Sequence, residues 1–238
     1  MPGYQAPITA LSAVGVFVIT PVSAPLVALA ATTTDAQMSE VERDALVRRS
    51  CELAIWGLPA VAAYDIELAL ERDAGAKPGT IAYMTAPMDS RHGFLTANDV
   101  TPYAFAGMPL NGDPMVIEVP PIGEKAQLFG SIINAWQRPL ADVGPSGEDA
   151  GTGCRYLVVP PGYKGEIPSE GYIIVKSDTA AVHFSFRPVA LNGGQMADQA
   201  AYAQRVKVYP LTDPNATWSF IDVYKNPVNT LPAVSYTH

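Results

Sequence analysis

A short polar stretch, Asn98-Asp99-Val100-Thr101-Pro102-Tyr103, holds the residue types of this chain that are best suited to chemistry. The Asp99 carboxylate could act as a base or hold a ligand, and the Tyr103 hydroxyl could donate a hydrogen bond or offer a stacking face. The alternative is an Asx-turn made by Asn98 and Asp99, with Tyr103 in the core. Polar loops that lead into a sheet often carry binding residues, so this stretch is the leading candidate.

Two further candidates lie on one alternating segment. Apolar and polar residues alternate over 181–189, which predicts a strand with one buried face, and His183 and Arg187 share its polar side. Arg187 could hold a carboxylate, and His183 could line the same groove. A structural ion pair for Arg187 and a hydrogen-bonded histidine are the alternatives.

An aromatic residue completes the set. Trp136 precedes Gln137-Arg138 at the predicted end of a strand, so it could stack on a sugar or an aromatic ligand, or pack at the rim of the sheet. The ligand-binding candidates are therefore Asn98, Asp99, Thr101, Tyr103, Trp136, His183 and Arg187. The sequence assigns no catalytic residue.

Several enzyme classes leave no motif here. The chain has no Gly-x-Ser-x-Gly elbow, no Walker loop, no His-Glu-x-x-His and no dinucleotide fingerprint. Gly151-Thr152-Gly153 leads into a predicted strand, so it is not a phosphate cradle. With three scattered histidines, of which His92 is a loop candidate, we expect neither a metal nor a cofactor.

Composition favours a folded, strand-rich and acidic protein. The 238 residues are 48% hydrophobic and only 16% charged, and 22 prolines and 19 glycines favour many turns between short strands. The formal net charge of −8, with no cluster of lysine or arginine to offset it, argues against nucleic acid as a partner.

The N-terminus is typical of a secretory signal. An apolar stretch, 8–19, is followed by Pro21, Pro25 and the small-residue motif Ala28-Leu29-Ala30, so residues 1–30 are interpreted as a signal peptide cleaved near Ala30. A membrane anchor is the alternative, although the stretch is shorter than a span requires. We expect a periplasmic or secreted protein in which Cys51 and Cys154 either pair or remain buried thiols.

The element pattern predicts an α+β fold, with N-terminal helices packed on an antiparallel β-sandwich or barrel-like sheet. Ser39 and Glu42 form a capping box for a helix over 40–56, Gly57-Leu58-Pro59 predicts a break, and a second helix covers 60–73. Thr80–Asn98 is expected to hold a short helix and a loop. Strands are expected at 115–119, 126–136, 156–159, 172–175 and 181–189, a helix at 195–205, and a loop from Pro210 onward.

The order of these motifs resembles the bacterial domain of unknown function 1254 (DUF1254). The features are Gly57-Leu58-Pro59, the turn at 98–103, Val119-Pro120, the Gly-x-Gly-x-x-Tyr-x-Val-x-x-Pro-Gly-Tyr-x-Gly stretch at 151–165, Arg187, Gln204 and Leu211-Thr212. The similarity covers 45–213, after a leader at 31–44. In this family the turn usually reads Asp-Thr, whereas Val100 separates the two residues here.

The resemblance implies an exported protein that often carries a second, C-terminal domain, DUF1214. That domain is absent from this chain, and residues 214–238 are interpreted as a truncated linker whose last residues, 234–238, are foreign. We expect an exported module that binds a small molecule or a glycan. The alternatives are a hydrolase with a polar cleft and an assembly domain that docks on the missing domain, and self-association is a further option.

Overall fold

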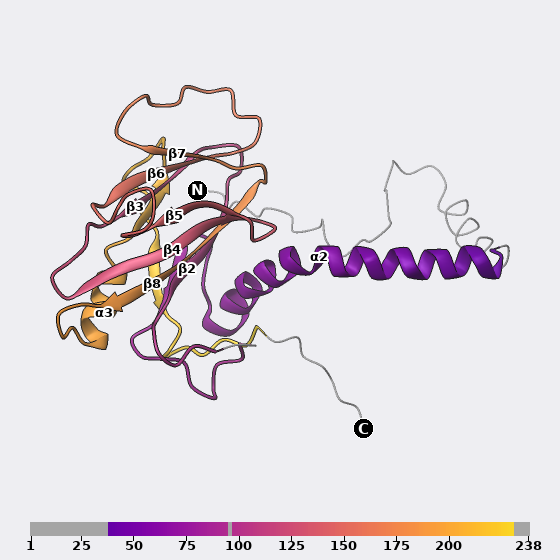
Figure 1. Ribbon diagram of the computed structural model, residues 1–238, viewed down its shortest axis with the longest axis horizontal. Helices are drawn as coiled ribbons and strands as arrows, with labels where there is room; N and C mark the ends of the chain where they lie inside the picture. The colour runs from indigo at the N-terminus through magenta and orange to yellow at the C-terminus, as the bar shows by residue number, and fades with distance from the viewer. Residues whose placement is uncertain (1–37, 95–96, 231–238) are drawn as a thin grey trace, which may run out of the picture. The chain divides into compact units, whose positions relative to one another are not determined.

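The computed structural model describes residues 38–94 and 97–230, and these form an α+β sandwich (Figure 1). The elements in chain order are α2 (Glu40–Ala74), β1 (Thr80–Tyr83), β2 (Ala104–Pro109), β3 (Met115–Val119), β4 (Ala126–Asn134), β5 (Pro139–Val143), β6 (Cys154–Val159), β7 (Ile173–Lys176), β8 (Ala181–Ala190), α3 (Met196–Ala203), β9 (Lys207–Pro210) and β10 (Ser219–Asp222). The predicted fold class is confirmed. The predicted signal peptide, the first half of the leader (31–37) and residues 234–238 lie outside the described residues.

The strands form two mixed sheets. The six-stranded sheet has the order β10-β1-β2-β8-β4-β5, and the four-stranded sheet has the order β7-β6-β3-β9. Most neighbours are antiparallel, but β1 pairs with β10 and β6 pairs with β7 in parallel. The long loop between β6 and β7 allows the parallel pairing, because parallel strands cannot be joined by a tight hairpin.

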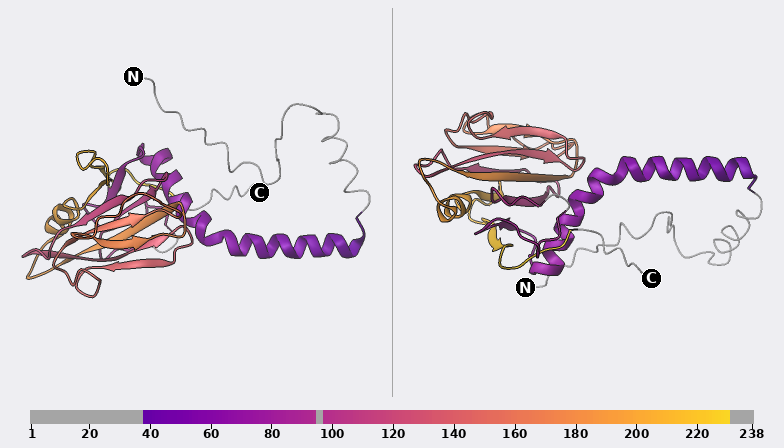
Figure 2. Two further views of the ribbon diagram at one scale, coloured as in Figure 1. Left: turned by 90° about the horizontal axis from the view of Figure 1, so that it is seen from above. Right: turned by 60° about the horizontal axis from the view of Figure 1, so that its bottom comes forward.

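The main core lies between the two sheets, and the stacking of the strands can be followed in Figure 2. Val182, Phe184 and Phe186 of β8 are all buried there, while the intervening residues face the other way. The rings of Phe184 and Phe186 lie 4.7 Å apart in a stacked arrangement. The alternation predicted for 181–189 is therefore confirmed, and it leaves the polar side of β8 on the outer face of its sheet.

Helix α2 is continuous, so the predicted break at Gly57-Leu58-Pro59 is wrong. Proline removes only its own amide donor, and Ile55, whose carbonyl loses that donor, is exposed to water. The predicted capping box is confirmed, because the Ser39 amide donates to Glu42 Oε2 at 2.8 Å and the Glu42 amide donates to Ser39 Oγ at 3.3 Å.

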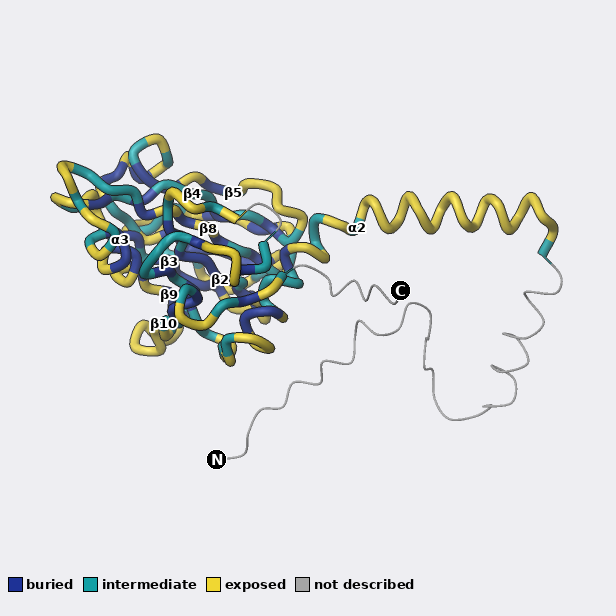
Figure 3. The backbone as a smooth tube through the Cα atoms, turned by 90° about the horizontal axis from the view of Figure 1, so that it is seen from below, coloured by how far each residue is buried: buried dark blue, intermediate teal, exposed yellow. Residues whose placement is uncertain are grey.

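The chain divides into two compact units, residues 1–54 and 55–238, and α2 belongs to both. In the first unit, the described part of α2 is exposed throughout (Figure 3). In the second unit, Ala69 and Leu70 of α2 pack with Ala82 and Phe105 in a smaller core.

By length and composition α2 could cross a membrane, since an 18-residue window has a mean hydropathy of 1.5, with 17% of that window buried.

Two expectations for less regular segments are wrong. Residues 80–83 form a strand where a short helix was expected, and the C-terminal segment contributes β10 where a loop was expected. Both errors have one cause, because β1 and β10 are short strands that pair with each other far apart in the sequence. Trp218 and Phe220 of this segment are half-buried against the main core. Cys51 and Cys154 are free thiols.

Candidate functional site

A row of polar side chains crosses the outer face of the four-stranded sheet. Glu118 of β3 lies opposite Arg155 of β6 on one side and Lys207 of β9 on the other. Tyr156 pairs with Ile173 in the parallel β6–β7 ladder, so Tyr172 extends the row beside Arg155. Because side chains alternate across a strand, the buried Tyr156 in the core fixes its neighbour Arg155 on the outer face.

Glu118 is held at the centre of this row by two neighbours from β9. Lys207 Nζ donates to Glu118 Oε1 at 2.7 Å, and the Tyr209 hydroxyl donates to Glu118 Oε2 at 3.1 Å. The Lys207 hydrogen bond, more than any other contact, lowers the pKa of Glu118 below its ordinary value. Burial and the Glu118 contact raise the pKa of Tyr209, so its hydroxyl remains a donor.

Arg155 stacks on a tyrosine ring and does not pair with a carboxylate of the described residues. Its guanidinium carbon lies 4.6 Å from the centre of the Tyr172 ring, and within residues 38–94 and 97–230 it makes no ion pair. A Cβ on Gly171 would lie 2.9 Å from Arg155 Nη2, and Gly171 has a φ of +81°. The positive φ favours glycine at position 171, and the absence of a side chain there leaves room for the guanidinium.

The surface beside this row is hollowed. A hollow of about 740 Å³ is lined by Glu118, Val119, Pro121, Thr152, Gly153, Cys154, Arg155, Gly171, Tyr172 and Ile173. A second hollow of about 290 Å³ shares Glu118, Val119 and Pro121 with the first and adds Pro120, Gln204, Arg205 and Lys207. Three cationic side chains and one carboxylate therefore line the two adjoining hollows, in a chain whose net charge is −8.

The loop that leads into β6 forms one wall of the larger hollow. A Cβ on Gly153 would clash with the backbone nitrogen of Pro121, so only glycine allows this close approach. Behind the wall, the Tyr156 hydroxyl lies 3.0 Å from Asp149 Oδ1, and the Gly144 amide donates to the same oxygen at 2.7 Å. Burial, followed by the Asp149 contact, raises the pKa of Tyr156 far above its ordinary value, so the phenol stays protonated.

Cys154 lines the same hollow, but its environment disfavours a reactive thiolate. Burial, reinforced by the charge of Asp149, raises the pKa of the Cys154 thiol to about 11. Nucleophilic cysteines require the opposite shift, since the thiolate is the reactive form. Cys154 therefore serves as a small half-buried wall residue.

The predicted polar stretch before β2 forms a self-contained turn. Asn98 Oδ1 accepts the amides of Val100 and Thr101 at 2.8 and 3.1 Å, which is the Asx-turn arrangement. Asn98 Nδ2 donates to Thr101 Oγ1 at 3.0 Å and to the Tyr103 hydroxyl at 3.2 Å. Asp99 is exposed.

Strand β8 brings Arg187 to the same turn. Ala104 pairs with Phe186, so the adjacent Tyr103 and Arg187 meet on the outer face of the six-stranded sheet. The Arg187 guanidinium carbon lies 5.0 Å from the centre of the Tyr103 ring. The structure therefore brings Asn98, Thr101, Tyr103 and Arg187 together.

His183 and Trp136 have other partners. His183 Nδ1 lies 3.1 Å from Glu67 Oε1 of α2, and Glu67 fits there because it occupies the space that a side chain on Gly107 would fill. Trp136 packs on Trp56, with ring centres 4.1 Å apart. Among the described residues, no hydrogen bond or ion pair links Asp99, His183 and Arg187, so the hydrolase alternative gains no catalytic constellation from this face.

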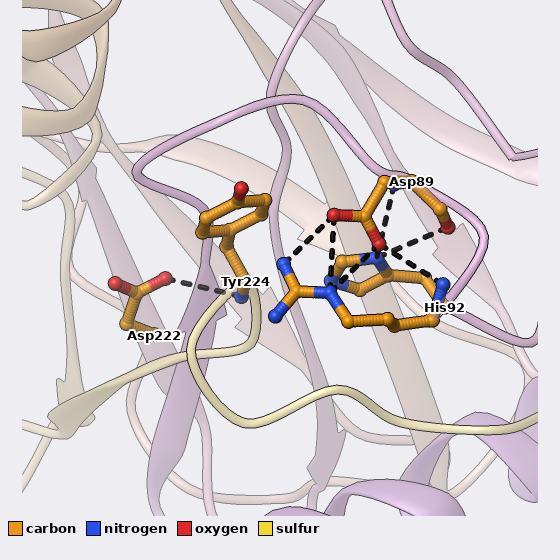
Figure 4. A network of polar contacts seen from close by, with 5 residues as sticks. Asp89, His92, Asp222 and Tyr224 are labelled. Atoms are coloured by element: carbon orange, nitrogen blue, oxygen red, sulfur yellow. Dashed lines mark hydrogen bonds and ion pairs between the residues drawn. The ribbon is translucent and has the colours of Figure 1, made fainter.

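His92 lies in a separate network near the C-terminal segment (Figure 4). Its ring is buried and stacks on Tyr224, with ring centres 5.6 Å apart, and its Nδ1 lies 3.1 Å from Asp89 Oδ1. Arg91 donates to both oxygens of Asp89 and lies over Tyr224 at 5.0 Å. The described part of the chain shows no group of three or more histidine, cysteine or acidic side chains that could hold a metal.

Sequence reasoning missed the residues of this polar row, which are Glu118, Arg155, Tyr172 and Lys207. A signal was present, because Arg155 precedes Tyr156 in a run of buried residues and must then point outward. Its neighbours on β3, on β9 and just before β7 depend on strand pairing, which the sequence pattern does not show.

The comparisons with known proteins identify the family. The profile of the family described as "Protein of unknown function (DUF1254)" matches residues 78–210, which include the whole polar row. No curated protein matches the chain. A crystal structure of the VPA0106 protein from Vibrio parahaemolyticus is similar, with a TM-score of 0.49 and 16% identity. The similarity covers 67% of this chain and 37% of that one, so the chain spans little more than a third of that protein's length. Since the family profile matches more than half of its residues, the chain belongs to the DUF1254 family.

Proposed function

We propose that this chain is a binding module for a small molecule or a glycan, and that the ligand occupies the larger hollow on the four-stranded sheet. The observation that carries the proposal is the hollow itself, a broad and open depression whose volume of about 740 Å³ can hold a small molecule. Its lining combines apolar side chains, such as Val119 and Ile173, with the charged Arg155 and Glu118.

The rigidity of the surroundings supports this proposal. The floor is formed by paired strands, and one wall is fixed by the close approach of Gly153 to Pro121. A site on paired strands is pre-organised, so a ligand need not order it on binding. The expected signal peptide fits an exported binding module, and cell fractionation of the expressed gene would test that part.

Isothermal titration of the purified full-length chain tests the binding proposal. The ligands are four matched compounds, namely glucose, glucuronate, benzamide and benzoate, together with phenyl phosphate. Thr152→Trp places a large side chain in the hollow, and Thr217→Trp places the same side chain in an exposed loop outside it.

We expect at least one compound to bind with one site per chain. Thr152→Trp should weaken that binding by at least about tenfold, a loss of about 1.4 kcal/mol, and Thr217→Trp should leave it unchanged. The proposal is wrong if the folded chain binds none of the compounds, or if Thr152→Trp binds them as well as the unaltered chain does.

A further inference from the structure

We infer that the ligand of the larger hollow carries an oxyanion, a carboxylate or a phosphate, and that Arg155 binds it. This inference rests on the proposed function, since it names the ligand class of the same site. It comes from the charges that line the hollow and from the contacts that hold each of them.

The charged side chains that line the hollow differ in whether they already have a partner. Glu118 is engaged by Lys207 at 2.7 Å and by the Tyr209 hydroxyl at 3.1 Å, so its two oxygens are both hydrogen-bonded. Arg155 has no carboxylate partner within the described chain, although it contributes to the lowered pKa of Glu118. The hollow therefore contains one balanced ion pair and one guanidinium that still lacks an anion.

The Arg155 guanidinium is positioned by the two residues beside it, Tyr172 and Gly171. Tyr172 lies under its face at 4.6 Å, and the missing side chain of Gly171 makes room for Nη2 itself. A guanidinium stacked on a ring keeps its N–H donors free at the edge, where they match the two oxygens of a carboxylate or phosphate. Stacking also reduces the side-chain entropy that binding would otherwise cost.

The remaining lining of the hollow indicates what the oxyanion is attached to. Val119, Pro121 and Ile173 line the hollow next to Arg155. Their side chains offer apolar surface and carry no carboxylate that could bind a cationic ligand. Arg205 lies in the adjoining hollow, over the Tyr202 ring at 5.3 Å, and adds to the positive potential there. An oxyanion attached to a small apolar or sugar ring satisfies both parts of this surface.

Matched ligands separate the charge from the carbon skeleton. Benzoate and benzamide differ mainly by one charge, as do glucuronate and glucose, and phenyl phosphate and inorganic phosphate distinguish a phosphate attached to a ring from the free ion. Binding is measured by titration at about 0.01 M and about 1 M salt, between which the Debye length falls from about 30 Å to about 3 Å.

Arg187 provides a matched control for Arg155. Both arginines lie over a tyrosine ring, at 5.0 and 4.6 Å, but Arg187 is on the six-stranded sheet. Arg155→Gln and Arg187→Gln therefore remove the same charge and the same ring contact, and only Arg155 lines the hollow. Glu118→Gln removes the carboxylate that lies opposite Arg155.

We expect the anionic member of each pair to bind more tightly than the neutral one, and high salt to weaken its binding. Arg155→Gln should weaken anion binding by about 10- to 100-fold, as expected for a lost charge-assisted hydrogen bond, and Arg187→Gln should have no effect. Glu118→Gln should strengthen anion binding, which a purely structural role of this row would not predict.

Four outcomes would overturn the inference. If neutral compounds bind as tightly as the anions, or if Arg155→Gln binds anions normally, the ligand class is wrong while the binding module stands. If Arg155→Gln and Arg187→Gln weaken anion binding equally, the effect comes from overall charge and the assignment to Arg155 is wrong. If no compound binds at all, the proposed function fails as well.

Discussion

Replacing Tyr156 by phenylalanine removes one hydroxyl from behind the wall of the larger hollow and leaves the ring in place. Tyr156 is fully buried, and its oxygen lies 3.0 Å from Asp149 Oδ1 and 2.9 Å from the carbonyl oxygen of Asp142. A phenol has one hydrogen, so these two acceptors share it. Asp149 Oδ2 is buried without a partner in the described structure, so Oδ1 carries the hydrogen bonds of this carboxyl group.

The expected loss of stability in Tyr156→Phe depends on the hydrogen bonds that the Asp149 carboxyl group retains. In Tyr156→Phe the carboxyl group keeps the Gly144 amide at 2.7 Å and no other donor. Losing one hydrogen bond to a buried charged acceptor costs about 1.5–3 kcal/mol. For a chain of this size, that loss lowers the melting temperature by about 3–12 °C.

Tyr209→Phe is the matched control. Tyr209 also donates a hydroxyl to an acid, Glu118, at 3.1 Å, but Glu118 keeps Lys207 and about a third of its side chain is exposed. Water can replace the lost donor there, so we expect a cost of about 0.5–1 kcal/mol.

Urea unfolding followed by circular dichroism measures both variants, and Asp149→Asn closes a double-mutant cycle with Tyr156→Phe. The coupling between Tyr156 and Asp149 should be at least about 1 kcal/mol, within the range for residues in direct contact. The reasoning is refuted if Tyr156→Phe costs no more than Tyr209→Phe, or if the cycle shows no coupling.

Two further predictions concern the titration of Asp73 and the reactivity of the two cysteines. The Arg72 hydrogen bond lowers the pKa of Asp73 from 3.8 to about 2, and Asp73 accepts the Asn229 amide at 2.9 Å. Because the folded pKa is the lower one, this stabilisation is present above about pH 4 and is lost as the pH falls through about 2. The NMR shift of the Asn229 amide should follow that midpoint and stop titrating in Asp73→Asn, whereas a midpoint near 3.8 would contradict the assignment. The thiols should also differ, because Cys51 is exposed and the Cys154 pKa is about 11. At pH 8 we expect Cys154 to react with a disulfide reagent about 100-fold more slowly than an ordinary thiol, and two equally fast thiols would contradict this.

Local patterns predicted the elements whose signals are complete within one segment. The capping box at Ser39 and Glu42 and the alternation around Phe184 each depend on residues within a few positions, and the structure confirms them. Position 59 shows the limit, because a proline normally ends a helix but α2 continues through it. Packing of Ala69 and Leu70 against the sheet stabilises the part of α2 that follows.

Strand pairing between distant segments could not be predicted in the same way. Ser219 lies opposite Thr80, and Phe220 lies opposite Ile81, in a parallel pair separated by almost the whole domain. Neither segment shows a long alternating pattern, since each strand has four residues. The pairing is decided by the burial of Phe220 and Trp218 against the main core. That burial exists only once the two sheets have formed, so the sequence pattern does not show it.

The same physics explains why the sequence drew attention to one sheet while the hollow lies on the other. A polar loop such as 98–103 is recognised by composition, and the structure shows that its side chains largely bond to one another. Arg155 sits in the strand that follows the glycine-rich segment 151–153, between residues that read as core. Its role depends on Tyr172 and Glu118, which strand register brings beside it from other parts of the chain. Because a lone outward-facing arginine on a strand looks like a solvated residue in any sequence, binding of a matched anion and its loss in Arg155→Gln are needed to distinguish a ligand-binding row from surface charge.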